Sequence, residues 1–152
     1  MPPIRKYKCN VCPLEFYAVW GGFAYVEGYD GQRVILTHPL ENQIIEKTLN
    51  IPHGILDSFW EEKPKWWWSK ERKSNYQKQL DIFDTVKARR GLLSDCLCLD
   101  CNQVQKFDLK KDEKKCRICS SLNLKPVREL LNSTCPKCKE GLIVEIETGG
   151  IS

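Results

Sequence analysis

Apolar and aromatic residues in the first quarter of the chain cluster in the short runs that are typical of β-strands. These runs lie between residues 4 and 37 and are separated by turn residues, among them Asp30-Gly31. Both of these residues tolerate positive φ, so they predict a hairpin turn. Residues 40–62 show instead the three- and four-residue spacing of short helices, interrupted at Pro52. We therefore expect a small antiparallel sheet followed by short helical pieces.

The longest helical pattern occupies the middle of the chain, at about residues 64–90. Tyr76, Leu80 and Phe83 recur at steps of four and three residues and would share one face. Two arginines followed by Gly91 suit a helix C-terminus, because cations favour the negative end of the helix dipole and glycine is a common cap. A helix over this whole stretch would be on the order of 40 Å long.

These patterns together predict an α+β fold made of three consecutive regions. Residues 1–62 form a β-rich region, residues 63–91 a basic, Trp-rich helix, and residues 92–152 a cysteine-rich region. A chain of 152 residues can bury a moderate core, and we expect the three regions to form one structural unit.

The cysteines add a chemical constraint, because eight of the nine occur as Cys-x-x-Cys. Two intervening residues let both sulfurs face one ion, and two such pairs complete a tetrahedral zinc site. The pairs are Cys9/Cys12, Cys98/Cys101, Cys116/Cys119 and Cys135/Cys138, which leaves Cys96 unassigned. We predict two structural zinc sites, with iron held by the same thiolates as the alternative. A thioredoxin-like role is disfavoured, because strand-like rather than helical sequence follows the pairs.

Four pairs can combine into two sites in three ways. The separations of 14 residues after Cys101 and 15 after Cys119 both suit a zinc ribbon, in which a hairpin separates two knuckles. Residues 95–128 resemble zinc-ribbon and rubredoxin-like modules, in which a strand follows each knuckle, although Asn102 and Ser120 stand where many ribbons have glycine. On that resemblance we favour one site made of Cys98, Cys101, Cys116 and Cys119. The other site is then Cys9, Cys12, Cys135 and Cys138, a nested arrangement similar to that of the cysteine-rich module of J-domain co-chaperones.

The two histidines offer an alternative set of ligands. His38 and His53 could complete a site with Cys9 and Cys12, but Cys135 and Cys138 would then have no partner pair. Closed sites of four thiolates activate water poorly, and the chain has neither a phosphate-binding glycine loop nor a nucleophile elbow. We therefore expect a protein that is not an enzyme, and keep a catalytic site near His38 or His53 as the last alternative.

The net charge of +4 is unevenly distributed, since residues 63–90 carry nine basic and three acidic side chains. Three consecutive tryptophans lie in this basic segment. Successive helical residues turn by about 100°, so one buried helix face cannot cover all three rings. They would either pack between the neighbouring regions or remain exposed among cations. The candidate binding surface is Lys63, Lys65, Trp66, Trp67, Lys70, Arg72 and Lys73.

We favour a zinc-ribbon protein that binds nucleic acid as an accessory subunit of a larger machine, because aromatic rings can stack on unpaired bases while cations hold phosphates. The alternative is a protein–protein adaptor anchored by the tryptophans. The N-terminus lacks the apolar core of a signal peptide, and no run approaches about 18 apolar residues. Paired cysteines without these signals favour a reducing, cytoplasmic location and no membrane partner.

Overall fold

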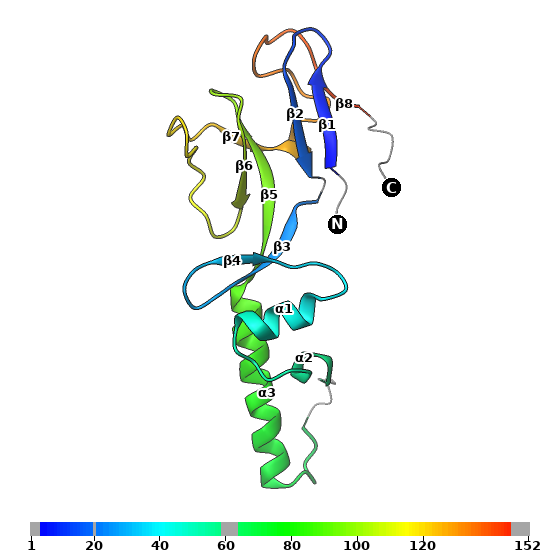
Figure 1. Ribbon diagram of the computed structural model, residues 1–152, viewed down its shortest axis with the longest axis vertical. Helices are drawn as coiled ribbons and strands as arrows, with labels where there is room; N and C mark the ends of the chain where they lie inside the picture. Colours follow the sequence, from blue (N-terminus) through cyan, green and yellow to red (C-terminus); the bar gives the residue numbers. More distant parts are fainter. Residues whose placement is uncertain (1–3, 20, 59–63, 147–152) are drawn as a thin grey trace. The chain divides into compact units, whose positions relative to one another are not determined.

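A computed structural model of the 152-residue chain describes residues 4–19, 21–58 and 64–146 and confirms the predicted α+β fold class. Most strand pairings are antiparallel. The elements in chain order are β1 (Ile4–Cys9), β2 (Glu15–Val19), β3 (Phe23–Glu27), β4 (Arg33–Ile35), α1 (Glu41–Thr48), α2 (Ile55–Ser58), α3 (Lys70–Arg89), β5 (Arg90–Cys98), β6 (Val104–Asp108), β7 (Leu124–Pro126), a 3-10 turn (Val127–Glu129) and β8 (Ile143–Ile146) (Figure 1).

The chain divides into two compact units. The first, here called the cysteine unit, combines the segment up to Phe23 with the segment from Leu92 onward. The second, the helical unit, is Ala24–Gly91. In the cysteine unit β1 pairs with β8, so one sheet joins two segments that are far apart in the sequence.

The cysteine unit contains a three-stranded sheet in the order β2-β1-β8 (Figure 1). β1 alternates strictly near its end, so Tyr7 and Cys9 face the core while Lys8 faces solvent. The Tyr7 ring stacks on that of Phe16 in β2, with ring centroids 5.5 Å apart. In the same unit β5 pairs with β6 and with β7. The core between these strands also holds Leu97, Val127 and Ile143.

The helical unit begins with the hairpin of β3 and β4, whose turn contains Asp30 and Gly31 as predicted. Gly31 has a φ of 79°, and the Asp30 carboxylate accepts a hydrogen bond from the backbone N–H of Gln32 at 3.0 Å. The core of this unit consists of apolar side chains from the hairpin, from α1 and its flanks, and from α3: Val26, Leu36, Ile45, Leu49 and Val86.

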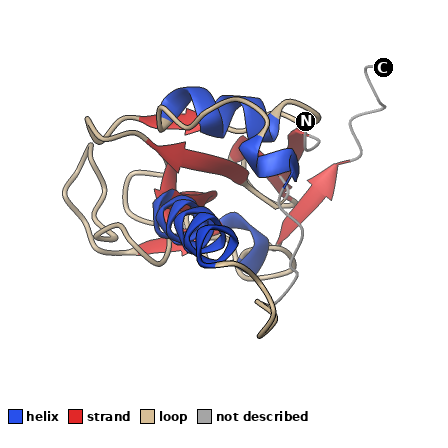
Figure 2. Ribbon diagram, turned by 90° about the horizontal axis from the view of Figure 1, so that it is seen from below, coloured by secondary structure: helices blue, strands red, loops and turns tan. Residues whose placement is uncertain are grey.

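The long helix α3 begins at Lys70, not at residue 63 or 64, so the three tryptophans precede it. Ser69 is its N-cap, with extended backbone and a side-chain oxygen that accepts a hydrogen bond from Arg72 N at 3.2 Å. The helix ends at Arg89, and β5 follows at once, so Gly91 is not the expected cap. Figure 2 looks along this helix. Among the described residues, no helix has the combined length and apolarity needed to cross a membrane.

Candidate metal centres and a Trp-rich surface

Three of the four knuckles share one backbone turn. The residue after the second cysteine has positive φ in each: 57° at Asn102, 60° at Ser120 and 62° at Lys139. Its N–H donates to the carbonyl of the first cysteine at 2.9–3.0 Å. Glycine would adopt this conformation most easily, but asparagine tolerates it and the tight turn enforces it on serine and lysine. The knuckle of Cys9 and Cys12 differs because Pro13 follows it, and proline has negative φ.

The knuckles combine in the nested way. The sulfurs of Cys98 and Cys119 lie 3.6 Å apart, as do those of Cys101 and Cys116. In the second group, the Cys9–Cys138 and Cys12–Cys135 distances are both 3.7 Å. All four sulfurs of each group lie within 4.8 Å of one another.

These distances suit a metal ion rather than disulfide bonds. Four sulfurs at about 2.3 Å from a tetrahedral zinc would be separated by about 3.8 Å, whereas a disulfide requires about 2.05 Å. Each group can therefore hold one metal ion. We call the group of Cys98, Cys101, Cys116 and Cys119 site 1, and the group of Cys9, Cys12, Cys135 and Cys138 site 2.

Backbone N–H groups favour a thiolate in each site before any metal binds. At site 1, hydrogen bonds from the backbone of Cys119 and Ile118 lower the pKa of Cys116 to about 6. At site 2, the backbone of Gly141 and Glu140 lowers the pKa of Cys138 to about 6. By contrast, burial raises the pKa of Cys101 to about 12. A cation is therefore required before all four groups ionise together, which couples metal binding to proton release.

Polar side chains other than the cysteines support site 1. The amide of Gln105 in β6 donates to the Cys116 sulfur at 3.0 Å and accepts the backbone N–H of Arg117 at 3.0 Å. Asp100 accepts hydrogen bonds from the side chains of Ser121 and Asn123, which joins the two knuckles. No motif marks Gln105 in the sequence, and only the register of β6 places it there.

Site 2 is tied to the sheet by Asn10. Its side-chain oxygen accepts the backbone N–H of Leu142 at 2.8 Å, and its own N–H donates to the Leu142 carbonyl at 3.1 Å. These bonds continue the pairing of β1 with β8. Sequence reasoning assigned Asn10 no role, because its partner is 132 positions away.

Cys96 belongs to neither site. Its side chain is buried and its sulfur donates a weak hydrogen bond to the carbonyl of Ser94 at 3.8 Å. Burial raises the pKa of its thiol to about 11, so it is the neutral thiol at physiological pH. It packs as an apolar residue between β6 and β7, opposite Gln105 and Pro126.

The histidines belong to the helical unit and to neither group of sulfurs. The side chains of His38 and His53 are 86% and 81% exposed, and His53 contacts the Glu46 carboxylate at 3.0 Å. The mixed site with Cys9 and Cys12 does not form, because those two sulfurs face Cys135 and Cys138.

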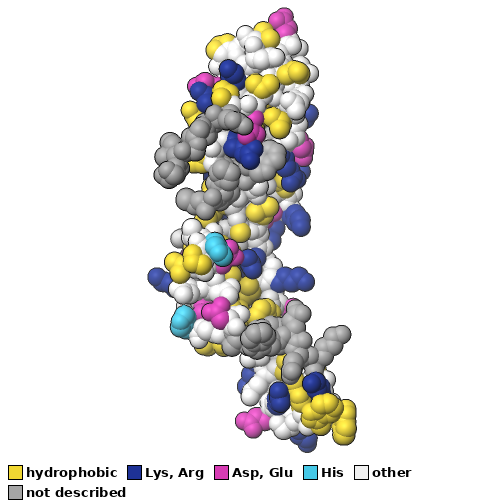
Figure 3. Space-filling model, turned by 90° about the vertical axis from the view of Figure 1, so that its right-hand side faces the viewer, with side chains coloured by type: hydrophobic (Ala, Val, Ile, Leu, Met, Phe, Trp, Pro, Cys, Tyr) yellow, Lys and Arg dark blue, Asp and Glu magenta, His cyan; other side chains and the backbone are white. Residues whose placement is uncertain are grey.

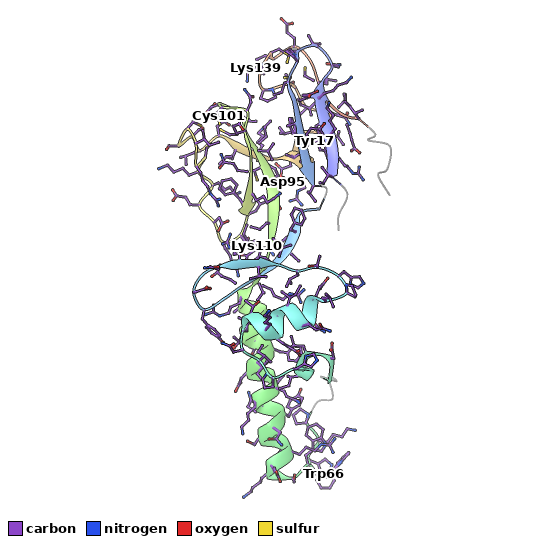
Figure 4. All side chains as sticks on the ribbon, in the orientation of Figure 1. Tyr17, Trp66, Asp95, Cys101, Lys110 and Lys139 are labelled. Atoms are coloured by element: carbon purple, nitrogen blue, oxygen red, sulfur yellow. The ribbon has the colours of Figure 1, made fainter. Side chains whose placement is uncertain are left out.

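Two of the three tryptophans form an exposed cluster before α3. Trp66 and Trp67 are 85% and 62% exposed and meet edge to face, whereas Trp68 is buried against Tyr76 at a centroid distance of 5.7 Å. The sequence predicted that the tryptophans lie in the long helix, and this was wrong because residues 66–68 form a turn and a bend before α3. Figure 4 labels Trp66 at the N-terminal end of α3.

Cations surround the two exposed rings. The Lys65 ammonium lies 5.5 Å from the centroid of the Trp67 ring, and that of Lys73 donates to the Trp66 carbonyl at 3.3 Å. Figure 3 shows hydrophobic, lysine and arginine side chains gathered at the lower end of the view. We call the described members of this cluster the Trp surface: Lys65, Trp66, Trp67, Lys70, Arg72 and Lys73. Lys63 of the predicted set lies outside the described residues.

Comparison with family models, with curated proteins and with solved structures finds no match to this chain. Its function is therefore inferred from its own residues.

Proposed function

We propose that this protein is a non-enzymatic zinc protein that binds single-stranded nucleic acid through the Trp surface, as an accessory subunit of a larger assembly. The observation that carries the proposal is the exposure of Trp66 and Trp67, at 85% and 62%, beside lysines on both sides in sequence. Stacking of a base on such a ring contributes about 1–3 kcal/mol, and the lysines supply charge for phosphates.

The two thiolate sites would serve this function by holding the cysteine unit together. Four protein ligands leave no open coordination position, so a metal ion here has a structural rather than a catalytic role. Zinc is the proposed ion because a tetrahedral set of four sulfurs is its usual structural site. Native mass spectrometry of the protein as purified should show two zinc ions, and a coloured, iron-containing protein would contradict this assignment.

Binding can be measured by fluorescence anisotropy with a labelled single strand of about 12 nucleotides at several salt concentrations. We expect affinity to fall steeply with salt, and the double variant Trp66→Ala/Trp67→Ala to bind at least about ten-fold more weakly because it lacks both stacking rings. Lys65→Ala/Lys73→Ala should make the salt slope shallower by about 0.7 for each phosphate that the variant no longer neutralises. Lys78→Ala, an exposed cation of α3 outside the Trp surface, is the matched control. Equal binding by the tryptophan variant and the parent would overturn the proposal.

The edge-to-face pair of Trp66 and Trp67 also favours a second candidate, a protein-binding adaptor. Its two rings have centroids 5.5 Å apart, and tryptophan and arginine dominate interface hot spots. A complex with a protein that is insensitive to salt but abolished in Trp67→Ala, together with no binding of the oligonucleotide, would replace the first candidate by this one.

A further inference from the structure

A cavity in the helical unit lies beside the end of α3 that is opposite to the Trp surface. It has a volume of about 610 Å³ and is formed by the turn between β3 and β4 and by the last turn of α1. Cavities of about 300–1,000 Å³ are the usual size for small-molecule ligands. Tyr29 and Gln32 line it from the hairpin turn, and Lys47 and Asn50 line it from the end of α1.

The hairpin side of this cavity is held in place by several hydrogen bonds. Gly28 N donates to the Gln32 carbonyl at 2.8 Å across the turn. Arg89, the last residue of α3, donates to the carbonyls of Glu27 and Gly28 at 3.3 and 2.9 Å. Its guanidinium also lies over the ring of Tyr29, 4.3 Å from the centroid. The ring is therefore positioned before any ligand arrives, which lowers the entropic cost of binding.

The chemistry of the lining matches a nucleotide. Tyr29 is 63% exposed, which leaves ring surface for stacking. The amides of Gln32 and Asn50 each offer donors and an acceptor, the groups that read the edges of bases. Lys47 supplies a cation for phosphate, and Val34 and Ile44 add apolar surface. The lining also contains Asp30, whose carboxylate accepts the backbone N–H of Gln32. We propose that the cavity binds one nucleotide, with the base stacked on Tyr29 and the phosphate at Lys47.

This inference rests on the proposed function. Its biological ligand would be one nucleotide within the single strand that the Trp surface binds. Ser69 precedes α3 and Arg89 is its last residue, and the 20 residues of the helix span about 30 Å. A strand must therefore extend over several nucleotides to occupy the cavity and the Trp surface of one helical unit together. We expect binding to tighten once the strand is long enough to occupy both, whereas a mononucleotide reports on the cavity alone.

The test is an NMR titration of the full chain with AMP, GMP, CMP and UMP, and with ribose 5-phosphate as the probe without a base. We expect at least one nucleotide to shift the amide signals of Gln32, Thr48 and Asn50. Tyr29→Ala should weaken that binding by about ten-fold, Tyr29→Phe should preserve it, and Lys47→Ala should weaken it several-fold. Equal binding of ribose 5-phosphate and the nucleotides, no shifts at the cavity, or equal binding by Tyr29→Ala would overturn the inference. Gln32→Ala provides a second test should Tyr29→Ala fail to fold.

The failures of the two proposals can be distinguished. Trp66→Ala/Trp67→Ala should bind the mononucleotide as the parent does, because its substitutions lie at the far end of α3. If the parent protein binds the mononucleotide at the cavity but no oligonucleotide, the proposed function fails and the cavity inference stands. If the oligonucleotide binds through the Trp surface without shifts at Gln32 and Asn50, the cavity inference fails alone.

Discussion

Site 2 depends on a residue that has no side chain. A Cβ added to Gly141 would lie 2.4 Å from the Cys9 sulfur and 2.7 Å from the Asn10 side-chain oxygen, closer than atoms can approach. The backbone of Gly141 also takes part in the knuckle, because its carbonyl accepts the N–H of Cys135 at 2.7 Å and its N–H donates to the Cys138 sulfur at 3.4 Å. Neither group can move away without disturbing the ligands.

We therefore expect Gly141→Ala to impair site 2 and leave site 1 intact. The methyl group would displace the Cys9 sulfur, so the metal content should fall from two ions to one when the protein is challenged with a chelator. Native mass spectrometry measures this directly. Glu140→Ala, at an adjacent exposed position, is the control and should retain both ions. Two ions held equally firmly by the glycine variant and its parent would show that the crowding is relieved elsewhere.

Glu46 is a buried carboxylate that organises the turn between α1 and α2. Its oxygens accept the backbone N–H groups of Gly54 and Leu56, both at 3.0 Å, and contact His53. Burial opposes ionisation, but the two backbone bonds and His53 outweigh it and hold the pKa of Glu46 below its usual value. The charged form thus stabilises the helical unit.

The sign of the pH dependence follows from that lowered pKa. The stabilisation is present at pH values above the unfolded-state pKa of about 4.3 and is lost as the pH falls through the folded-state pKa. Glu46→Gln should cost about 1–3 kcal/mol at neutral pH, and the cost should shrink below about pH 4. Hydrogen exchange of the Leu49 and Val86 amides measures the unfolding free energy of this unit. A cost that is constant from neutral to acid pH would contradict this role, and Glu41→Gln, in a more exposed position, is the control.

At the scale of elements, the start of α3 decides where the tryptophans lie. The run of apolar and basic residues from residue 64 gives no sign of a boundary by periodicity alone. Ser69 provides it, because its side chain caps the helix and its backbone is extended. The ring of Trp68 packs against that of Tyr76, and the Arg72 guanidinium lies 4.2 Å from the centroid of the Trp68 ring. Trp66 and Trp67 face solvent. The start of α3 could have been predicted from the sequence if Ser69 had been treated as an N-cap that ends the helical pattern before it.

Substitution of Ser69 should destabilise the first turn of α3, which carries Lys70, Arg72 and Lys73 of the Trp surface. Ser69→Ala removes the hydrogen bond to Arg72 N and should cost about 1 kcal/mol. Ser74→Ala, inside the same helix and exposed, should instead stabilise α3 by a few tenths of a kcal/mol through helix propensity. Hydrogen exchange at Lys73 compares the two variants. Opposite changes in protection are expected, and equal protection would argue against capping by Ser69.

At the scale of the whole molecule, hydrophobic periodicity predicts local structure but not which distant strands pair. Each knuckle is formed by residues close in sequence, so the Cys-x-x-Cys spacing and the Asp30-Gly31 turn could be predicted. The pairing of β1 with β8 joins residues such as Cys9 and Ile143, and no periodicity reveals such a contact. The division into two units is consistent with that pairing, because both strands belong to the cysteine unit. The resemblance to zinc ribbons favoured the nested combination of knuckles. The spacing of the cysteines alone did not decide among the three possible combinations of the four pairs.

The division into two units makes metal removal a selective perturbation. All nine cysteines lie in the cysteine unit, whereas the helical unit, Ala24–Gly91, contains none. A structural site of four thiolates contributes about 10–16 kcal/mol in small zinc peptides, which is comparable to the stability of a whole domain. Chelation under reducing conditions should therefore unfold the cysteine unit and leave the core around Val26, Ile45 and Val86 folded.

NMR of the full chain distinguishes the two responses, because dispersed amide signals report each unit separately. After chelation we expect loss of dispersion for β1, β2 and β8 and its retention for α1 and α3. The variant Cys9→Ser/Cys12→Ser should lose one metal ion and loosen β8 as well, since site 2 connects that strand to β1. Cys98→Ser/Cys101→Ser should lose one ion but keep β1 paired with β8. If chelation also unfolds the helical unit, its stability depends on the metal-bound unit, and the two would then act as one cooperative domain.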